Sequence, residues 1–172
     1  MIEKVILVDS EDNEIGLMEK LEAHKKGLLH RAFSGFVFNK NHELLLQRRD
    51  FKKYHNGGLW SNTVCSHPRK GEKIEDAVKR RIFEELGFNA DFKEIGKLVY
   101  KTSFPNGLTE NEYDHICISL YNNQKIIPNP DEVCDYKWIS REELTKEINQ
   151  NAENFTFWLR KILELNLFNN YF

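Results

Sequence analysis

Two adjacent arginines are followed closely by two adjacent glutamates in this chain, and side chains at this spacing could bind a metal ion and a phosphate. Glu84 and Glu85 follow shortly after Arg80 and Arg81. Glu85 lies one helical turn after Arg81, so a carboxylate and a guanidinium would share one face of a helix. Carboxylates bind hard divalent cations, and such a cation could in turn bind a diphosphate. The alternative is an ordinary amphipathic helix with a solvated charged face.

Chemically active residues occur two positions apart at two other places. Glu110 and Glu112 would project from the same side of an extended strand, which is the arrangement that chelation requires. Cys65 and His67 would likewise share one side of an extended segment. A cation bound near the thiol would lower its pKa and ease proton exchange, whereas Cys65 without such a cation would be a buried apolar residue.

The composition favours one globular domain and argues against several classes of partner. The chain has 172 residues, 40% of them hydrophobic, which suits a single sizeable core. A net charge of −2 and the lack of a long basic run argue against a nucleic-acid or anionic-membrane partner. Residues 1–9 resemble neither a signal peptide nor a membrane span, which predicts a cytosolic protein.

The three cysteines, Cys65, Cys117 and Cys134, show no CxxC spacing. Their odd number and scattered positions argue against a disulfide framework or a zinc knuckle. Cys117 and Cys134 occur in apolar, strand-like runs, and we expect both to be buried apolar residues.

The elements that must position these residues are mixed strands and helices. Residues 74–86 give the strongest helix prediction, because apolar side chains recur there at helical spacing and Gly87 supplies a stop. Residues 32–38 and 43–48 predict a hairpin around a turn at 39–41. The other expected elements are strands at 4–8, 60–65, 92–102, 113–121 and 133–139, a turn at 9–16, a loop or short helix at 20–30, a loop at 52–58, and two final helices, one opened by Ser140 and one at about 155–165. This pattern predicts a mixed sheet flanked by helices, an α/β (α+β) fold.

The segment Ser66–Glu72 followed by Arg80–Phe88 resembles the signature of the Nudix family. Five residues match that pattern: Glu72, Arg80, Glu84, Glu85 and Gly87. Ser66 replaces the first glycine of the pattern, and Arg81 replaces a glutamate. Nudix hydrolases need the full acidic set, so Arg81 speaks against hydrolysis.

One branch of this family, the type 1 isopentenyl-diphosphate isomerases, is similar over nearly the whole chain, from Val5 to Trp158. In that branch the signature is preceded by a Trp-(Thr/Ser)-Asn-(Ser/Thr)-Val-Cys-x-His-Pro run, and Trp60–Pro68 reads WSNTVCSHP here. The likeness implies the Nudix fold, a mixed β-sheet sandwiched between helices, in a single domain over 1–172 with a Nudix core at about 30–150. It also implies a metal-dependent enzyme that interconverts isopentenyl and dimethylallyl diphosphate in isoprenoid biosynthesis.

The resemblance further implies a metal site and a set of proton-transferring residues. One divalent metal, Mn²⁺ or Mg²⁺, with Zn²⁺ also compatible with imidazole ligands, would be bound by His24, His30, His67, Glu110 and Glu112. The segment from His24 to His30 is one residue shorter than in familiar members of the family. Cys65 and Glu112 would transfer protons on opposite faces of the substrate, with Tyr100 assisting Glu112.

Two more roles follow from the same resemblance. Trp158 would stabilise a carbocation with its aromatic face, although core packing is an equally good account of this residue. The substrate diphosphate would be bound by Lys20, Arg49, Lys53 and Arg81, together with a Mg²⁺ held by Glu85. We expect His42, His55 and His115 to be surface or satisfied core residues.

Two other functions compete with this interpretation. One is a Nudix hydrolase of a nucleoside or other diphosphate, and the other is a non-catalytic, ligand-sensing Nudix domain. The expected partner is a small isoprenoid diphosphate, with no nucleic acid, no membrane, and no flavin or nicotinamide cofactor. We expect a monomer or a homodimer.

Overall fold

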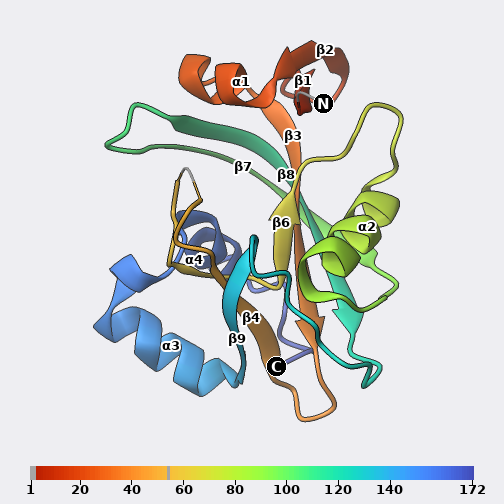
Figure 1. The fold of residues 1–172 in the computed structure, drawn as a ribbon, viewed down its shortest axis with the longest axis vertical. Coiled ribbons are helices and arrows are strands. Elements are labelled where there is room, and N and C mark those ends of the chain that lie inside the picture. The colour runs from red at the N-terminus through yellow and green to blue at the C-terminus, as the bar shows by residue number, and fades with distance from the viewer. Residues whose placement is uncertain (1–2, 54) are drawn as a thin grey trace.

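Nine strands in the described part of the chain, residues 3–53 and 55–172 of this computed structural model, form one mixed sheet with helices on both faces (Figure 1). The strands are β1 (Lys4–Val8), β2 (Glu14–Glu19), β3 (His30–Phe38), β4 (Leu44–Arg49), β5 (Trp60–Ser61), β6 (Val64–Ser66), β7 (Lys93–Ser103), β8 (Thr109–Leu120) and β9 (Val133–Ile139). The helices are α1 (Lys20–Lys26), α2 (Ile74–Leu86), α3 (Arg141–Gln150), the 3₁₀ turn η1 (Ala152–Asn154) and α4 (Phe157–Leu163). The expected fold class is confirmed.

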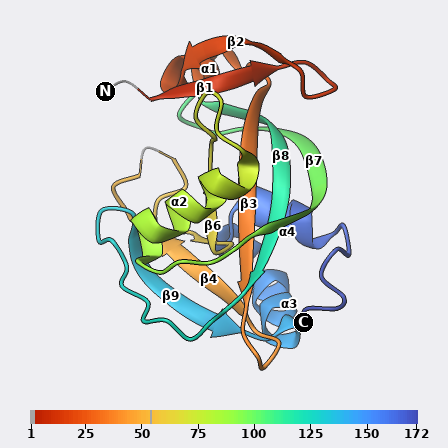
Figure 2. The ribbon, with the colours of Figure 1, turned by 90° about the vertical axis from the view of Figure 1, so that its right-hand side faces the viewer.

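Strand β3 is the centre of the sheet and separates the two cores. It pairs in parallel with β8 along its whole length, and on its other edge with β1, β6 and β4 in turn. Because side chains alternate along a strand, Phe33 and Val37 face the core beneath α2, whereas Phe36 and Phe38 face the core beneath α4. Figure 2 shows α2 in front of the sheet with α3 and α4 behind it.

Helix α2 spans the predicted residues and ends as predicted. Its apolar stripe is buried at Ala77, Val78, Ile82 and Leu86, and its charged side chains other than Glu85 are exposed or half-buried. Gly87 ends the helix with φ of 73°, a conformation that glycine adopts at low cost.

The N-terminal region differs from the prediction. Residues 9–16 were expected to form a turn, but the turn is shorter and β2 begins at Glu14 to form a hairpin with β1. The residues of β2 are exposed or half-buried, so the segment lacks the apolar alternation that marks a strand in sequence. Helix α1 fulfils the prediction of a short helix within 20–30.

The predicted hairpin at residues 32–48 is only partly correct. Strands β3 and β4 are joined by the expected turn, but they pair only at Phe38 and Leu44. They then separate, and β4 pairs with β9 instead. The expected strand at 60–65 is divided into β5, which pairs with β4, and β6, which pairs with β3. This separation places β6 against the middle of β3, on the edge opposite β8.

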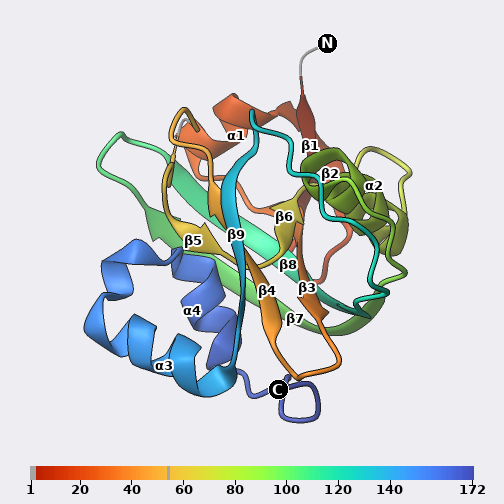
Figure 3. The same cartoon turned by 60° about the horizontal axis from the view of Figure 1, so that its bottom comes forward.

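The C-terminal helices were predicted approximately. Ser140 and Glu143 form a capping box at the start of α3, as the position of Ser140 indicated. The last helix is shorter than the expected 155–165, because the chain reaches α4 through Phe155 and Thr156 in an extended conformation. The amide of Thr156 donates to Trp60 O at 2.9 Å, which fixes α4 beside β5 (Figure 3).

The cysteines divide into three environments. Cys117 is fully buried, as expected, and Cys65 is half-buried. The expectation for Cys134 was wrong, because this residue is exposed. It lies on β9 at the edge of the sheet, where its apolar neighbours Val133 and Ile139 are buried. No described helix is long and apolar enough to cross a membrane.

Candidate active site

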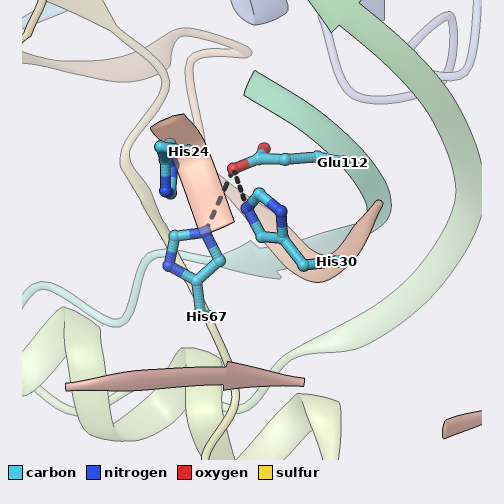
Figure 4. Close-up of side chains that lie close together, drawn as sticks. All are labelled: His24, His30, His67 and Glu112. Atoms are coloured by element: carbon cyan, nitrogen blue, oxygen red, sulfur yellow. Dashed lines mark hydrogen bonds and ion pairs between the residues drawn. The ribbon is translucent and has the colours of Figure 1, made fainter. Parts of the chain in front are cut away.

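Three histidines and one glutamate converge from four separate segments of the chain (Figure 4). His24 lies on α1, His30 begins β3, His67 follows β6 and Glu112 lies on β8. One ligand atom from each residue can be chosen so that all four atoms lie within 4.8 Å of one another. Imidazole nitrogens with a carboxylate suit a divalent metal. The group formed by His24, His30, His67 and Glu112, called the metal group below, could therefore hold such an ion.

Local structure sets the orientation of two of these imidazoles. His24 Nδ1 donates to Lys20 O at 2.7 Å, and His30 Nδ1 donates to Leu28 O at 2.8 Å. With the proton on Nδ1, Nε2 is the nitrogen that carries a lone pair in the neutral ring. This pattern is typical of metal-binding histidines, whose second nitrogen donates to a carbonyl or carboxylate. The observed bonds therefore fit a metal at the group.

The compact turn after α1 brings His24 and His30 together. Gly27 adopts φ of 61° and ends the helix, and its amide donates to His24 O. Asn111 on β8 donates its side-chain amide to Gly27 O at 3.0 Å, which ties the turn to the strand that carries Glu112. The parallel register then places His30 opposite Glu112.

Glu112 links the metal group to Tyr100. Its Oε1 lies 3.1 Å from His67 Nε2 and 3.6 Å from His30 Nε2, while its Oε2 accepts from the Tyr100 hydroxyl at 2.5 Å. Burial alone would raise the pKa of Glu112, but the hydrogen bonds and charges of His30 and His67 hold it well below its usual range. Burial and the nearby carboxylates raise the pKa of Tyr100, so its hydroxyl stays protonated.

The structure places Glu110 outside the metal group. Its carboxyl is buried and contacts His55 Nε2 through Oε1, and its Oε2 lies 3.4 Å from the Tyr100 hydroxyl. Burial and then the charge of Glu112 raise the pKa of Glu110 well above its usual range. The two carboxyls, which face the same way on β8, therefore share the Tyr100 hydroxyl but have different histidine partners.

His55 was not predicted as a site residue. It is only 8% exposed, lines the cavity described below, and has its ring centroid 5.9 Å from that of His24 and 5.5 Å from that of Phe104. Burial and the charge of Arg49 lower its pKa to about 3, so the ring is neutral. The only sequence signal was its position two residues after Lys53 in the polar loop.

Cys65 faces the same cavity. Its Sγ lies 3.8 Å from Arg49 Nη1 and 4.0 Å from Ser61 Oγ. Burial raises the pKa of the Cys65 thiol to about 12, against the opposing charge of Arg49. The protein's own groups thus keep this thiol protonated, and the lowering expected from a nearby cation stays a prediction.

Trp158 forms one wall of the cavity. Its ring is 3% exposed, and Nε1 donates at 3.1 Å to both Ser61 Oγ and Asn62 Oδ1. The guanidinium carbon of Arg49 lies 5.5 Å from the centre of the ring. This indole is therefore fixed in place and presents its face to a cation.

Cationic side chains line the other side of the cavity. Lys20, Arg49, Lys53 and Arg81 all contribute to the lining. Lys53 forms an ion pair with Glu132, and Arg81 Nη2 lies 3.4 Å from the same carboxylate. Arg49 forms no ion pair with a carboxylate among residues 3–53 and 55–172.

Glu85 is buried and lies next to these cations. Its Oε1 accepts from Arg81 at 2.5 Å, and its Oε2 accepts from Gln47 Nε2 at 2.8 Å. The shared face that was expected for Arg81 and Glu85 is therefore present. Neither Gln47 nor Glu132 was expected to contribute, because neither contact is local in sequence.

One cavity joins these parts. It is lined by residues from the metal group, by the thiol, the tyrosine and the indole, and by the cations: Lys20, His24, Gln47, Arg49, Lys53, His55, Cys65, His67, Arg81, Glu85, Tyr100, Glu110, Glu112, Glu132 and Trp158. His30 belongs to the metal group but not to this lining. The cavity thus has a cationic side and a side with groups that can donate and accept protons.

Comparison with known proteins agrees with this arrangement. A family model described as the NUDIX domain matches residues 28–159. The chain is 46% identical over 164 residues to "Isopentenyl-diphosphate Delta-isomerase 2" of Aromatoleum aromaticum, covering 95% of this chain and 86% of that protein. The chain belongs to the Nudix family, in the branch of the isopentenyl-diphosphate Delta-isomerases.

A second relative and a solved structure also match this chain over most of their length. A protein of the same name from Photorhabdus laumondii is 47% identical, over 95% of this chain and 92% of that one. Among solved structures, the protein DR0079 from Deinococcus radiodurans has the same fold with a TM-score of 0.70 and 19% identity, over 86% of this chain and 90% of that one. The recognised Nudix pattern and the predicted fold are therefore confirmed.

Proposed function

We propose that this chain interconverts isopentenyl diphosphate and dimethylallyl diphosphate, in line with the isomerase names of its relatives. The observation that carries the proposal is that Cys65, Tyr100 and Glu112 share one cavity with the metal group and with four cations. A Nudix hydrolase needs a full acidic set, whereas here Arg81 occupies one of those positions and lines the cavity.

The proposed reaction moves one proton on and another off. A proton adds to the terminal alkene carbon of isopentenyl diphosphate, the positive charge forms at the tertiary carbon, and a proton then leaves C2. Cys65 acts on one face of the substrate, and Glu112 with Tyr100 acts on the other. An alkene is a very weak base, so the acid must be held in a site that excludes water.

The remaining residues bind the substrate or stabilise the charge. Trp158 presents an aromatic face to the carbocation without offering it a nucleophile. Lys20, Arg49, Lys53 and Arg81 bind the diphosphate, and a Mg²⁺ that accompanies the substrate is held at Glu85.

The proposed metal is Mn²⁺ or Mg²⁺, with Zn²⁺ as a further imidazole-compatible ion, held by the metal group and Glu110. When bound, it would orient the Glu112 carboxylate and balance its charge next to Tyr100. The expectations of a cytosolic location and of a monomer or homodimer stay predictions.

The test is incubation of the purified protein with isopentenyl diphosphate and Mn²⁺ or Mg²⁺ in deuterated water. We expect dimethylallyl diphosphate with deuterium in the new methyl group, and label at C2 of recovered isopentenyl diphosphate. Release of phosphate from a nucleoside diphosphate without any exchange of this kind would instead support the hydrolase.

A further inference from the structure

The buried carboxyl of Glu110 has a partner that lies outside the metal group. Glu110 is 4% exposed, and its Oε1 contacts Nε2 of His55. Its other oxygen faces the Tyr100 hydroxyl at 3.4 Å, a long hydrogen bond next to the 2.5 Å bond from that hydroxyl to Glu112. His55 is therefore the closer of the two side-chain partners that Glu110 has here.

The surroundings of His55 fix its ring in this place. Its carbonyl accepts from Arg49 Nη2 at 3.5 Å, and its ring lies beside Phe104 and, at 6.4 Å between centroids, beside Trp158. The loop that carries it is closed at its base by main-chain bonds from Arg49 N to Leu59 O and from Gly58 N to Arg49 O. The imidazole is thus held from several sides.

His55 does not belong to the metal group. Its nitrogens are not among the ligand atoms that lie within 4.8 Å of one another, and its Nε2 is engaged by Glu110. Carboxylates that serve metal sites are themselves held by outer hydrogen-bond partners, and removing such a partner commonly weakens metal binding by about 10- to 100-fold. His55 occupies the position of such a partner.

We infer that His55 is a positioning residue for Glu110, which it orients toward the metal group from the loop between β4 and β5. The inference rests on the proposed function in that the metal group and Glu110 together bind a divalent cation. It adds to the site a residue that is not one of the proposed metal ligands.

This arrangement also connects the two sides of the cavity. Lys53, a proposed diphosphate contact, lies two residues before His55 on the same loop. A loop anchored to Glu110 keeps Lys53 near Glu132 and Arg81. The loop thus contacts the metal side through His55 and the phosphate side through Lys53.

The experiment measures binding of Mn²⁺ alone, by competition with a fluorescent chelator, in His55→Phe and His55→Gln. Phenylalanine keeps a ring against Phe104 and Trp158 but removes the hydrogen bond, whereas glutamine keeps an amide N–H donor. We expect His55→Phe to bind Mn²⁺ about 10- to 100-fold more weakly, and His55→Gln to recover most of that loss. Phe104→Leu, which alters the packing of the same ring, should change the affinity by no more than about threefold.

A double-mutant cycle separates positioning from a general structural effect. In a Glu110→Gln background, His55→Phe should have little further effect on Mn²⁺ affinity, because the carboxylate that His55 orients is already gone. An unchanged affinity in a folded His55→Phe variant would overturn the inference, and so would an equal loss in the Glu110→Gln background. If His55→Phe fails to fold by circular dichroism, His55→Ala, which removes the same hydrogen bond, takes its place in the cycle.

Because the probe is Mn²⁺ without substrate, this result is independent of turnover. Normal His55-dependent binding without isomerisation would remove the proposed function and leave the inference standing. Isomerisation with His55-independent binding would do the reverse.

Discussion

Three acidic side chains on the same face of β8 are held in different states. Glu112, in the middle, has its pKa lowered by the histidines against the effect of burial, whereas burial and the charge of Glu112 raise the pKa values of Glu110 and Asp114. Asp114 accepts a hydrogen bond from Ser34 at 2.8 Å. A lowered pKa between two raised ones disfavours three buried negative charges in a row. This difference lets neighbouring carboxyls hold and accept a proton.

The thiol and the carboxylate should both be required for isomerisation. We expect Cys65→Ala and Glu112→Gln each to lower kcat by about 10²- to 10⁴-fold, the range that a positioned acid or base contributes. Deuterium incorporation into the product provides the measurement. Cys134→Ser is the matched control, since that thiol is exposed and lies outside the cavity lining. Normal label uptake in either active-site variant would remove that residue from the mechanism.

The aromatic face of Trp158 should matter more than its hydrogen bonds. Trp158→Leu removes the ring, and a lost cation–π contact of about 2 kcal/mol corresponds to a kcat about 30-fold lower. Trp158→Phe removes the bonds to Ser61 and Asn62 but keeps a ring, so its kcat should stay closer to the original. Urea unfolding of both variants provides the control for stability. Equal losses of kcat in the two variants would leave Trp158 with a packing role only.

The residues of the site could be predicted where the sequence matches the family pattern. His24, His67 and Glu112 were identified from the family pattern, and the structure brings them together. His55, Gln47 and Glu132 were missed, because each owes its contact to a partner at least 38 positions away. Pairings of that kind depend on tertiary structure and leave no local periodicity.

The elements around β3 are packed too closely to accept an added methyl group at Gly35. A Cβ there would lie 2.7 Å from Val64 Cγ1 and 2.9 Å from Val78 Cγ1. We expect Gly35→Ala to lower the free energy of unfolding by about 1–3 kcal/mol, the usual cost of overpacking. It should also reduce isomerase activity, because the displaced strand β6 carries Cys65.

Chemical denaturation with Gly16→Ala as a control tests this prediction. A Cβ at Gly16 would meet only Leu7, at 4.0 Å. Alanine in a strand loses less conformational entropy on folding than glycine, so this variant should be unchanged or more stable by up to about 1 kcal/mol. Equal stability of the two variants would show that the contact at Gly35 relaxes freely.

The elements themselves were predicted better than their pairing. The periodicity of α2 and the apolar runs of β1 and β9 were sufficient to place them, because these segments bury apolar residues. Strand β2 was missed because none of its residues is fully buried. The parallel pairing of β3 with β8 joins residues about 80 positions apart, and the turn between β3 and β4 gave the misleading impression of a continuous hairpin.

The whole molecule brings two chemically different sides to one cavity. The N-terminal segment supplies His24 and Lys20 from α1, and the helix α2 on the face of the sheet supplies Arg81 and Glu85. Cys65, which lies between these two segments in the sequence, reaches the cavity from β6. Because its ligands come from four separate segments, the metal group exists only in the folded chain. A bound ion therefore stabilises the folded state of the whole molecule.

Thermal unfolding should show this linkage and its pH dependence. Mn²⁺ at 100 times its Kd should add about 2.7 kcal/mol, which for a chain of this size raises Tm by about 5–10 °C. Protons compete with the metal for imidazole nitrogens, but burial lowers the pKa of His67 to about 4 from 6.5, and the pKa of His24 is lowered for the same reason. The rise in Tm should therefore persist at pH 5.5 and disappear only as the pH approaches 4.

His67→Ala should abolish the rise in Tm that Mn²⁺ causes. The control, His42→Asn, should retain this rise, because His42 lies at an exposed turn with φ of 62° that asparagine accepts. A Tm that is insensitive to Mn²⁺ at neutral pH would contradict metal binding by this group.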